Sequence, residues 1–321
     1  MGVATLRVWP MYLWKVPHML KGMLTYVPAL NAWRGRRATT GGSNSPRYCY
    51  SVWLRHLIML DRFGFKISGA HVGELGPGDS IGIGLAAVLS GAARYVGLDL
   101  MAFSTRSNTL EVFNSLVELY GHRVAIPDHH EFPNVRPIVD SHALPEYLID
   151  WNGFIERVER VRHELSAGLN SGPSIRYRAP WTSVDDIAKG SLDLVFSQAV
   201  LEHVDALEEV YGAMFVWLRR GGYASHIIDC GAHHISPLWN GHWAYSEWEW
   251  RLVRGQREFL LNREPLSTHL AFAQRVGFDT LLVQREYDNQ GFHVGALSKR
   301  FRHLDPEDFR TRRAMLILRK R

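Results

Sequence analysis

The sequence has few cysteines and no uninterrupted apolar run of membrane-spanning length. Only Cys49 and Cys230 occur among 321 residues, and their spacing fits neither a disulfide framework nor a zinc site. The most apolar candidate, residues 8–32, contains Lys15, Lys21 and three prolines, so it lacks the roughly 20 apolar residues that a transmembrane helix needs. With 46% hydrophobic and 21% charged residues, the composition indicates a globular protein with a sizeable core, which we expect in the reducing cytoplasm.

The first 60 residues lack acidic side chains altogether. They contain eight Lys and Arg residues, so the remainder of the chain is net negative although the whole has a net charge of +5. We interpret residues 1–65 as a basic, aromatic, helical segment. We favour a lid that packs on the main domain, and the alternative is that residues 1–36 lie peripherally on an anionic inner-membrane surface.

Beyond residue 65, short apolar runs alternate with helical patterns, which predicts a doubly wound α/β fold with helices on both faces of a sheet. Residues 121–173 interrupt this pattern, and we treat them as an insertion with an amphipathic helix at about 145–169 whose apolar side includes Phe154 and Ile155. We expect strands near 70–75, 94–100, 175–178, 191–197, 223–229, 280–285 and 313–318, and helices near 47–63, 80–89, 105–120, 206–218 and 267–276. The last two strands follow a long connection and predict an antiparallel hairpin.

A glycine-rich turn follows the first predicted strand and precedes a helix, an order that suits nucleotide binding. The turn reads Glu74-Leu75-Gly76-Pro77-Gly78. Ile81 stands where the dinucleotide fingerprint requires Gly or Ala, so NAD and flavins lose support. Asp99 closes the second strand, and its carboxylate can accept hydrogen bonds from both hydroxyls of a ribose. The two features together indicate a ligand with an adenosyl group.

These motifs resemble the class I methyltransferases that use S-adenosylmethionine (SAM), whose first motif is acidic-x-Gly-x-Gly. The stretch Ser191–Val204, which ends in Leu-Glu-His-Val, is similar to the fourth strand and following loop of the type 11 group in this family. Leu218–Tyr223 resembles the turn into that group's fifth strand. The resemblance covers residues 70–230 and implies a Rossmann-like sheet of seven strands, SAM as the cofactor and methyl transfer (EC 2.1.1) as the activity.

The resemblance also implies where SAM would be bound. The glycine-rich turn would line its methionine part, Asp99 its ribose, and Ala179-Pro180 its adenine. Glu74 would order the turn or reach the amino group of SAM through water. Arg178 stands where the family often has Asp, which is a departure in the adenine loop. The implied cofactor-binding residues are Glu74, Gly76, Pro77, Gly78, Asp99, Leu100, Ala179, Pro180, Ser197 and Gln198.

Three histidines are candidates for a general base, which a hydroxyl acceptor usually needs. The resemblance places His203 near the methyl donor, and His233 and His234 follow the fifth strand, where parallel sheets bind ligands. Each could equally be a capping, packing or loop residue. We predict no metal site, because the neighbouring side chains of His129-His130 and of His233-His234 would point in opposite directions in a strand.

Residues 231–265 are expected to form a lid on the acceptor side. Five aromatic residues within Trp239–Trp250 are interleaved with polar ones, a mixture that suits stacking on a sugar ring as well as the core of a lid. We therefore predict methylation, at oxygen, of a small-molecule, sugar or lipid-linked acceptor. One alternative is RNA methylation, against which stands the lack of a recognisable RNA-binding module. Another is a non-catalytic subunit of the same fold at a membrane surface.

Overall fold

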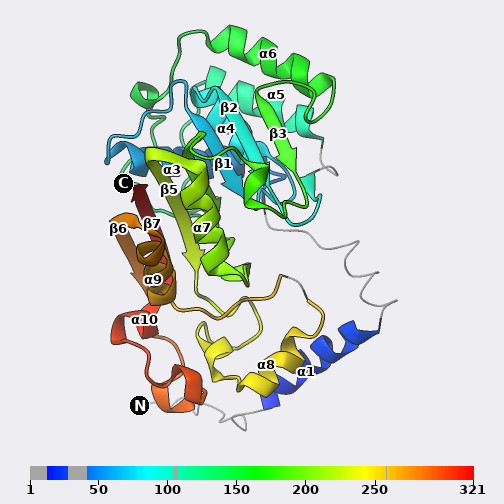
Figure 1. Ribbon diagram of the computed structural model, residues 1–321, viewed down its shortest axis with the longest axis vertical. Helices are drawn as coiled ribbons and strands as arrows, with labels where there is room; N and C mark the ends of the chain where they lie inside the picture. The colour runs from blue at the N-terminus through cyan, green and yellow to red at the C-terminus, as the bar shows by residue number, and fades with distance from the viewer. Residues whose placement is uncertain (1–12, 28–41, 105–107, 258) are drawn as a thin grey trace, which may run out of the picture.

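A seven-stranded sheet forms the centre of the computed structural model, which describes residues 13–27, 42–104, 108–257 and 259–321 (Figure 1). The strands are β1 (His71–Leu75), β2 (Arg94–Leu98), β3 (Ile175–Arg178), β4 (Leu192–Gln198), β5 (Leu218–Asp229), β6 (Phe278–Tyr287) and β7 (Thr311–Lys320). Their order is β3-β2-β1-β4-β5-β7-β6. Strands β1 to β5 are parallel, and β7 is antiparallel to β5 and β6. The predicted doubly wound fold with seven strands and a terminal antiparallel hairpin is confirmed.

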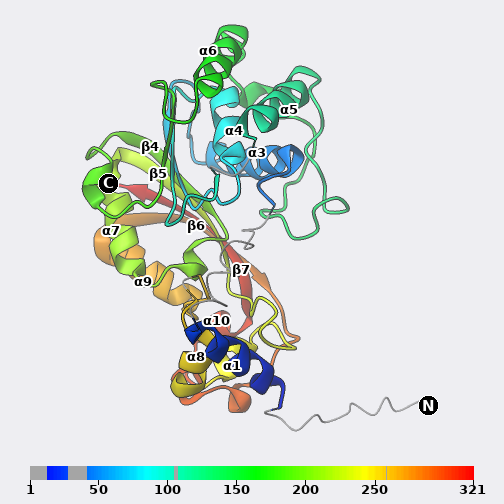
Figure 2. The same cartoon turned by 90° about the vertical axis from the view of Figure 1, so that its right-hand side faces the viewer.

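Helices cover both faces of the sheet (Figure 2). One face carries α3 (Pro46–Asp61), α4 (Gly82–Ser90), α5 (Thr109–Gly121) and α6 (Phe154–Ser166), and the other carries α7 (Leu207–Trp217) and α9 (Leu266–Val276). Helix α3 begins where Ser45 accepts a hydrogen bond from the Tyr48 backbone, with a proline in the first turn. Its Trp53 is fully buried and donates to the Ser90 hydroxyl at 2.8 Å. Although it belongs to the segment 1–65, α3 therefore packs in the core of the sheet domain.

Two elements differ from their predicted bounds. Helix α6 begins only at Phe154, because Gly153 before it has a left-handed backbone (φ 63°) and residues 146–148 form a separate 3-10 turn. The side chain of Ile155 is 68% exposed, so its placement on the apolar side of the helix was wrong. Strand β5 begins at Leu218, directly after α7, and Gly221 (φ 79°) lies inside this strand. The register with β4 is irregular at this point, since Leu192 pairs with Leu218 but Leu194 pairs with Tyr223.

A smaller lobe lies beyond the carboxyl ends of the parallel strands (Figures 1 and 2). It contains α1 (Val16–Met23), α8 (Glu247–Arg254) and α10 (Pro306–Arg310). Helices α1 and α8 approach closely at Gly22, where an added Cβ would lie 1.9 Å from a carbonyl oxygen of α8. The buried Lys15 ammonium donates to the Ala244 carbonyl at 2.7 Å and pairs with Glu249 at 2.9 Å. The basic segment is thereby joined to the lobe.

Most of the predicted aromatic cluster forms the core of this lobe. Trp239, Trp243, Tyr245 and Trp250 are buried, whereas Trp248 is 60% exposed. The Trp243 indole donates to the Arg263 carbonyl at 3.0 Å. Among the described residues, no helix combines the length and apolar character that a membrane crossing requires.

The packing of α4 on β2 generates the first prediction. Gly84 of α4 lies against the buried Tyr95, and a Cβ at Gly84 would lie 1.9 Å from its ring. We expect Gly84→Ala to lower the free energy of unfolding by about 1–3 kcal/mol through overpacking, measured by urea denaturation. Gly212 of α7 is the matched control, because a Cβ there meets no atom within 4 Å. Gly212→Ala should raise stability by up to about 1 kcal/mol, and equal effects of both substitutions would contradict the packing argument.

Candidate functional site

The first cavity lies where the order of strands reverses, at the carboxyl ends of β1 and β4. In doubly wound sheets this is the position at which ligands bind. The cavity has a volume of about 440 Å³. The glycine-rich turn, the end of β2, the loop after β3 and the segment after β4 all contribute to its walls. Residues from these four segments include Gly76, Asp99, Leu100, Trp181, Thr182, Val200 and His203.

The glycine-rich turn requires glycine for two different reasons. Gly76 and Gly78 have φ values of 62° and 72°, in the left-handed region. In addition, a Cβ at Gly76 would lie 2.8 Å from the side chain of Val200, which lines the same cavity. The glycine-rich turn can therefore approach the segment after β4 this closely only because Gly76 has no side chain.

Asp99 is fixed by the backbone around it. Its Oδ2 accepts a hydrogen bond from the Gly78 amide at 3.1 Å, and its Oδ1 accepts one from the Leu100 amide at 2.8 Å. The side chain is largely buried, and burial raises the pKa of its carboxyl to about 6 in spite of these bonds. A carboxylate has about four lone-pair sites, so acceptor capacity for a ligand hydroxyl remains beside these backbone contacts. The residue predicted to hold a ribose thus lines the cavity in a fixed orientation.

Glu74 is buried beneath the turn and does not line the cavity. Its Oε2 accepts a hydrogen bond from the Tyr95 hydroxyl at 2.7 Å, and the side chain is 1% exposed. Burial raises the pKa of this carboxyl to about 8. Of the two roles predicted for Glu74, these contacts favour ordering the turn over reaching the ligand.

Of the ten predicted cofactor residues, Gly76, Asp99 and Leu100 line the cavity. Pro77 and Gly78 belong to the turn beside it, and Ala179-Pro180 immediately precede the lining residue Trp181. Ser197 is not brought to the cavity, because its buried hydroxyl lies 2.8 Å from Nδ1 of His226.

Gln198 points toward α3 instead, where its Oε1 lies 3.1 Å from Nε2 of His56. Val200 and Phe259 also line the cavity and were not predicted. Arg178, the departure in the adenine loop, forms an ion pair with Asp186 at 3.1 Å. Trp181 directly follows the predicted Ala179-Pro180, whereas nothing near Phe259 in the sequence marks it as a wall residue.

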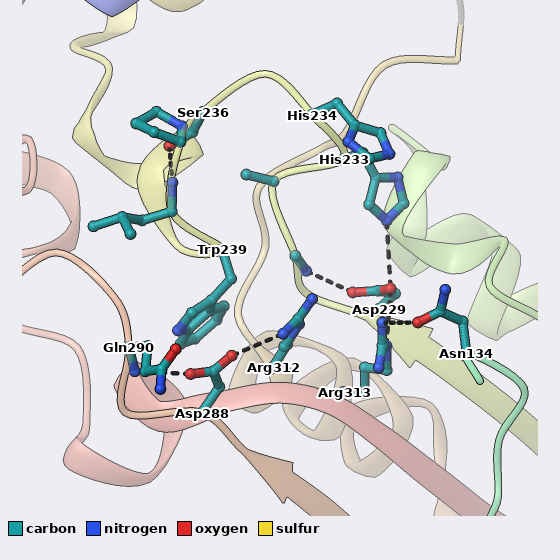
Figure 3. Close-up of a pocket in the computed structure, with 14 residues that line it drawn as sticks. Asn134, Asp229, His233, His234, Ser236, Trp239, Asp288, Gln290, Arg312 and Arg313 are labelled. Atoms are coloured by element: carbon teal, nitrogen blue, oxygen red, sulfur yellow. Dashed lines mark hydrogen bonds and ion pairs between the residues drawn. The ribbon is translucent and has the colours of Figure 1, made fainter. Parts of the chain in front are cut away.

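A second cavity of about 490 Å³ opens between β5, β7 and the lobe (Figure 3). Its walls are mainly polar, and its charged residues other than histidine are two Asp and two Arg. Arg313 pairs with Asp229 at 3.1 Å, and Arg312 pairs with Asp288 at 2.8 Å. The formal charges in the walls therefore balance when the histidines are neutral. Gln290, Asn134 and Ser236 add uncharged polar groups, and Trp239 adds an aromatic one.

Both predicted histidines after β5 line this second cavity (Figure 3). His233 and His234 have φ values of 43° and 65°, in the left-handed region that residues other than glycine adopt uncommonly. Nε2 of His233 lies 3.7 Å from Oδ2 of Asp229, as an ion pair beyond hydrogen-bond length. Burial acts to lower the pKa of His233, but the carboxylates of Asp229 and Glu202 outweigh it and raise this pKa.

The two cavities approach each other at a pair of histidine rings. His203 lines the first cavity and His233 the second, and their ring centroids lie 5.1 Å apart. Burial lowers the pKa of His203 to about 4 and raises that of the neighbouring Glu202 to about 8. The ligand atoms of Glu202, His203 and His233 lie within 4.8 Å of one another. These residues come from two different loops, so adjacent histidines in the sequence could not predict the cluster.

Comparisons with known proteins give similarity in structure alone. No protein-family model and no curated protein sequence matches the chain. A SAM-dependent methyltransferase from Mesorhizobium loti superposes with a TM-score of 0.41 at 13% identity, over 82% of this chain and 96% of the other. One from Methanosarcina mazei gives 0.43 at 11% identity, over 81% and 96%. Phosphoethanolamine N-methyltransferase 2 of Haemonchus contortus, in complex with SAM, gives 0.42 at 15% identity, over 84% and 52%.

The fold is assigned from the strand order, because TM-scores and identities this low carry no argument about activity. Five parallel strands in the order β3-β2-β1-β4-β5, followed by an antiparallel β7 inserted between β5 and β6, are the arrangement of the class I methyltransferase fold. The fold that the sequence motifs implied is thus confirmed. A fold by itself does not establish a reaction.

Proposed function

We propose that this protein transfers the methyl group of SAM to a hydroxyl of an uncharged, polyhydroxylated acceptor. The observation that carries the proposal is the close approach of two cavities at His203 and His233, one suited to an adenosyl ligand and the other polar. Methyl transfer is an in-line displacement, so it requires donor and acceptor pockets that open onto one point.

SAM suits the first cavity for reasons of shape and charge. The fixed carboxylate of Asp99 can accept both ribose hydroxyls, and the apolar walls with Trp181 suit a flat adenine ring. Ile81 in place of Gly or Ala weakens the case for a dinucleotide. SAM therefore accounts for the motifs and the cavity together.

The second cavity suits an acceptor that is polar but carries no net charge. Its two arginines are each paired with an aspartate, so an anionic acceptor would have to break one of these pairs. Trp239 offers an aromatic face, and Gln290 and Asn134 offer side-chain amides. This combination is typical of sites that stack on and hydrogen-bond to a sugar.

His203, His233 and His234 remain the candidates for the general base that takes the proton of the acceptor hydroxyl. His203 and His233 lie at the junction, whereas His234 lines the second cavity only. The two junction histidines are therefore the stronger candidates.

A contact of residues 1–36 with the membrane is supported by the described part, residues 13–27. Leu13, Val16, Leu20, Met23, Leu24, Tyr26 and Val27 are each about half exposed, and six of these seven recur at helical spacing. The opposite face carries Lys15, Gly22 and Thr25 and is buried on the lobe. The absence of acidic residues from positions 1–60 favours an anionic bilayer as the partner of this stripe, which would suit a lipid-linked acceptor.

Asp99→Asn should weaken SAM binding, measured by calorimetry, roughly 10–100-fold, because hydrogen bonds to a charged acceptor are lost. In the wild type, the affinity should fall as the pH drops through about 6, where Asp99 takes up a proton and loses acceptor capacity. The variant should lack this part of the pH dependence. Asp185→Asn, an exposed carboxylate near the same cavity, is the control and should bind as the wild type does. Equal affinities of Asp99→Asn and wild type would refute the ribose assignment.

Formation of S-adenosylhomocysteine should occur with uncharged sugars or sugar lipids and not with tRNA or phosphoethanolamine, which carry a net negative charge. The physical reason is that both arginines of the second cavity are already paired with aspartates. Trp239→Leu should raise the KM of an accepted sugar by roughly tenfold with the SAM affinity unchanged, since one stacking surface is lost. Turnover with RNA or with phosphoethanolamine alone would overturn the acceptor assignment.

Leu20→Ser should reduce binding to phosphatidylglycerol-containing vesicles roughly tenfold in a sedimentation assay, because one leucine no longer enters the bilayer. Ile155→Ser is the matched control, since Ile155 is a similarly exposed apolar residue on α6, outside the stripe. Vesicles of phosphatidylcholine alone should bind the wild type more weakly. Equal losses in both variants, or no binding of the wild type, would argue for a lid with no lipid contact.

A further inference from the structure

Glu202, His203 and His233 form a cluster of three side chains, whereas a general base requires only one. Glu202 and His203 belong to the 3-10 turn Leu201–His203 after β4, and His233 belongs to the loop after β5. We propose that these three side chains bind a divalent first-row transition-metal cation at the junction of the two cavities. The use of this cation in catalysis rests on the proposed methyl transfer, whereas its binding does not.

The distances suit a cation after small side-chain adjustments. One ligand atom from each residue lies within 4.8 Å of the other two. Zinc lies about 2.0–2.2 Å from nitrogen and oxygen ligands, so two ligands of a tetrahedral ion are about 3.4 Å apart. Glu202 is held in the core, whereas the His233 side chain is 32% exposed and can rotate toward it. Closing the cluster therefore requires movement mainly of one accessible ring.

Two buried atoms in the cluster have no hydrogen-bond partner within the part of the chain that the structure describes. They are Oε2 of Glu202, whose residue is only 4% exposed, and Nδ1 of His203. A buried polar atom without a partner costs about 1–3 kcal/mol, and more when it is charged. A cation between the two side chains would satisfy both atoms at once.

The surroundings resemble the outer contacts of metal-binding histidines. Such histidines usually form a hydrogen bond from the second ring nitrogen to a carboxylate or a backbone carbonyl. Asp229 lies 3.7 Å from Nε2 of His233. Oε1 of Glu202 accepts from the Asp229 amide at 3.3 Å, which fixes the carboxylate. Asp229 thus contacts two of the three proposed ligands.

The ligand types select the class of cation. Two imidazoles and one carboxylate favour Zn²⁺, Mn²⁺, Fe²⁺ or Co²⁺, whereas Mg²⁺ and Ca²⁺ prefer oxygen ligands only. With three protein ligands, a fourth position stays open for an acceptor oxygen.

In the reaction, an acceptor hydroxyl bound at the open position would lose its proton to solvent more readily, because the cation stabilises the alkoxide. The alkoxide oxygen then forms the new O–CH3 bond while the S–CH3 bond of SAM breaks. The electron pair of the broken bond stays on sulfur, which gives neutral S-adenosylhomocysteine and a methyl ether.

The test uses the full-length protein treated with a chelator, dialysed and titrated with Co²⁺, whose visible absorption reports its ligands. We expect one Co²⁺ per chain, and Zn²⁺ should displace it whereas Mg²⁺ should not. Glu202→Gln and His233→Ala should each weaken Co²⁺ binding at least tenfold. His234→Ala, the neighbouring residue outside the cluster, should bind Co²⁺ as the wild type does. Thermal melts establish that each variant is folded.

SAM binding is measured on the same samples, so that a failure of the cation-site proposal can be distinguished from a failure of the proposed methyl transfer. Absence of a Co²⁺ spectrum in a protein that binds SAM would overturn the cation site and leave the methyltransferase proposal standing. Co²⁺ binding that Glu202→Gln and His233→Ala do not weaken would also overturn it. Co²⁺ binding in a protein that does not bind SAM would uphold the site and refute the proposed function.

Discussion

The reversal of strand order between β1 and β4 is the constraint on which the rest of the structure depends. On one side of this point the chain proceeds from β1 to β2 and β3, and on the other side from β4 to β5. The loops that follow β1 and β4 therefore diverge and leave a space that no connection fills. Gly76 limits the width of this space, because its bare backbone lies against Val200. Both cavities and the histidine junction are positioned around it.

The fold was predictable because its signals are local. Each strand is a short apolar run, and each predicted cofactor motif lies within a few residues of a strand end, so the sequence could bring Gly76 and Asp99 to the same edge of the sheet, where both line the first cavity. The side chains of Ser197 and Gln198 could not be placed, because alternate residues of a strand point to opposite faces and the register decides which. The resemblance to a family indicates which residues follow a strand, but it does not indicate to which face of the sheet their side chains point.

The histidine cluster was not predictable for a different reason. Glu202 and His233 are 31 positions apart, and they meet only because β4 and β5 are adjacent and parallel. Such pairs cannot be recognised from neighbours in sequence, on which the prediction of no metal site was based. Similarly, the sequence did not indicate which aromatic residues of the lobe are buried. The buried Trp243 and the exposed Trp248 occur in similar sequence surroundings.

The attachment of α1 to the lobe has a consequence for synthesis of the chain. Lys15 and Glu249 are separated by 234 residues, so the helix emerges from the ribosome long before its partner exists. At about 5–20 residues per second, this interval is roughly 10–50 s. During it, both the stripe of half-exposed residues and the face around Gly22 are uncovered, and a lipid surface or a chaperone can reach them first. The order in which the chain is made could thus determine where the finished protein resides.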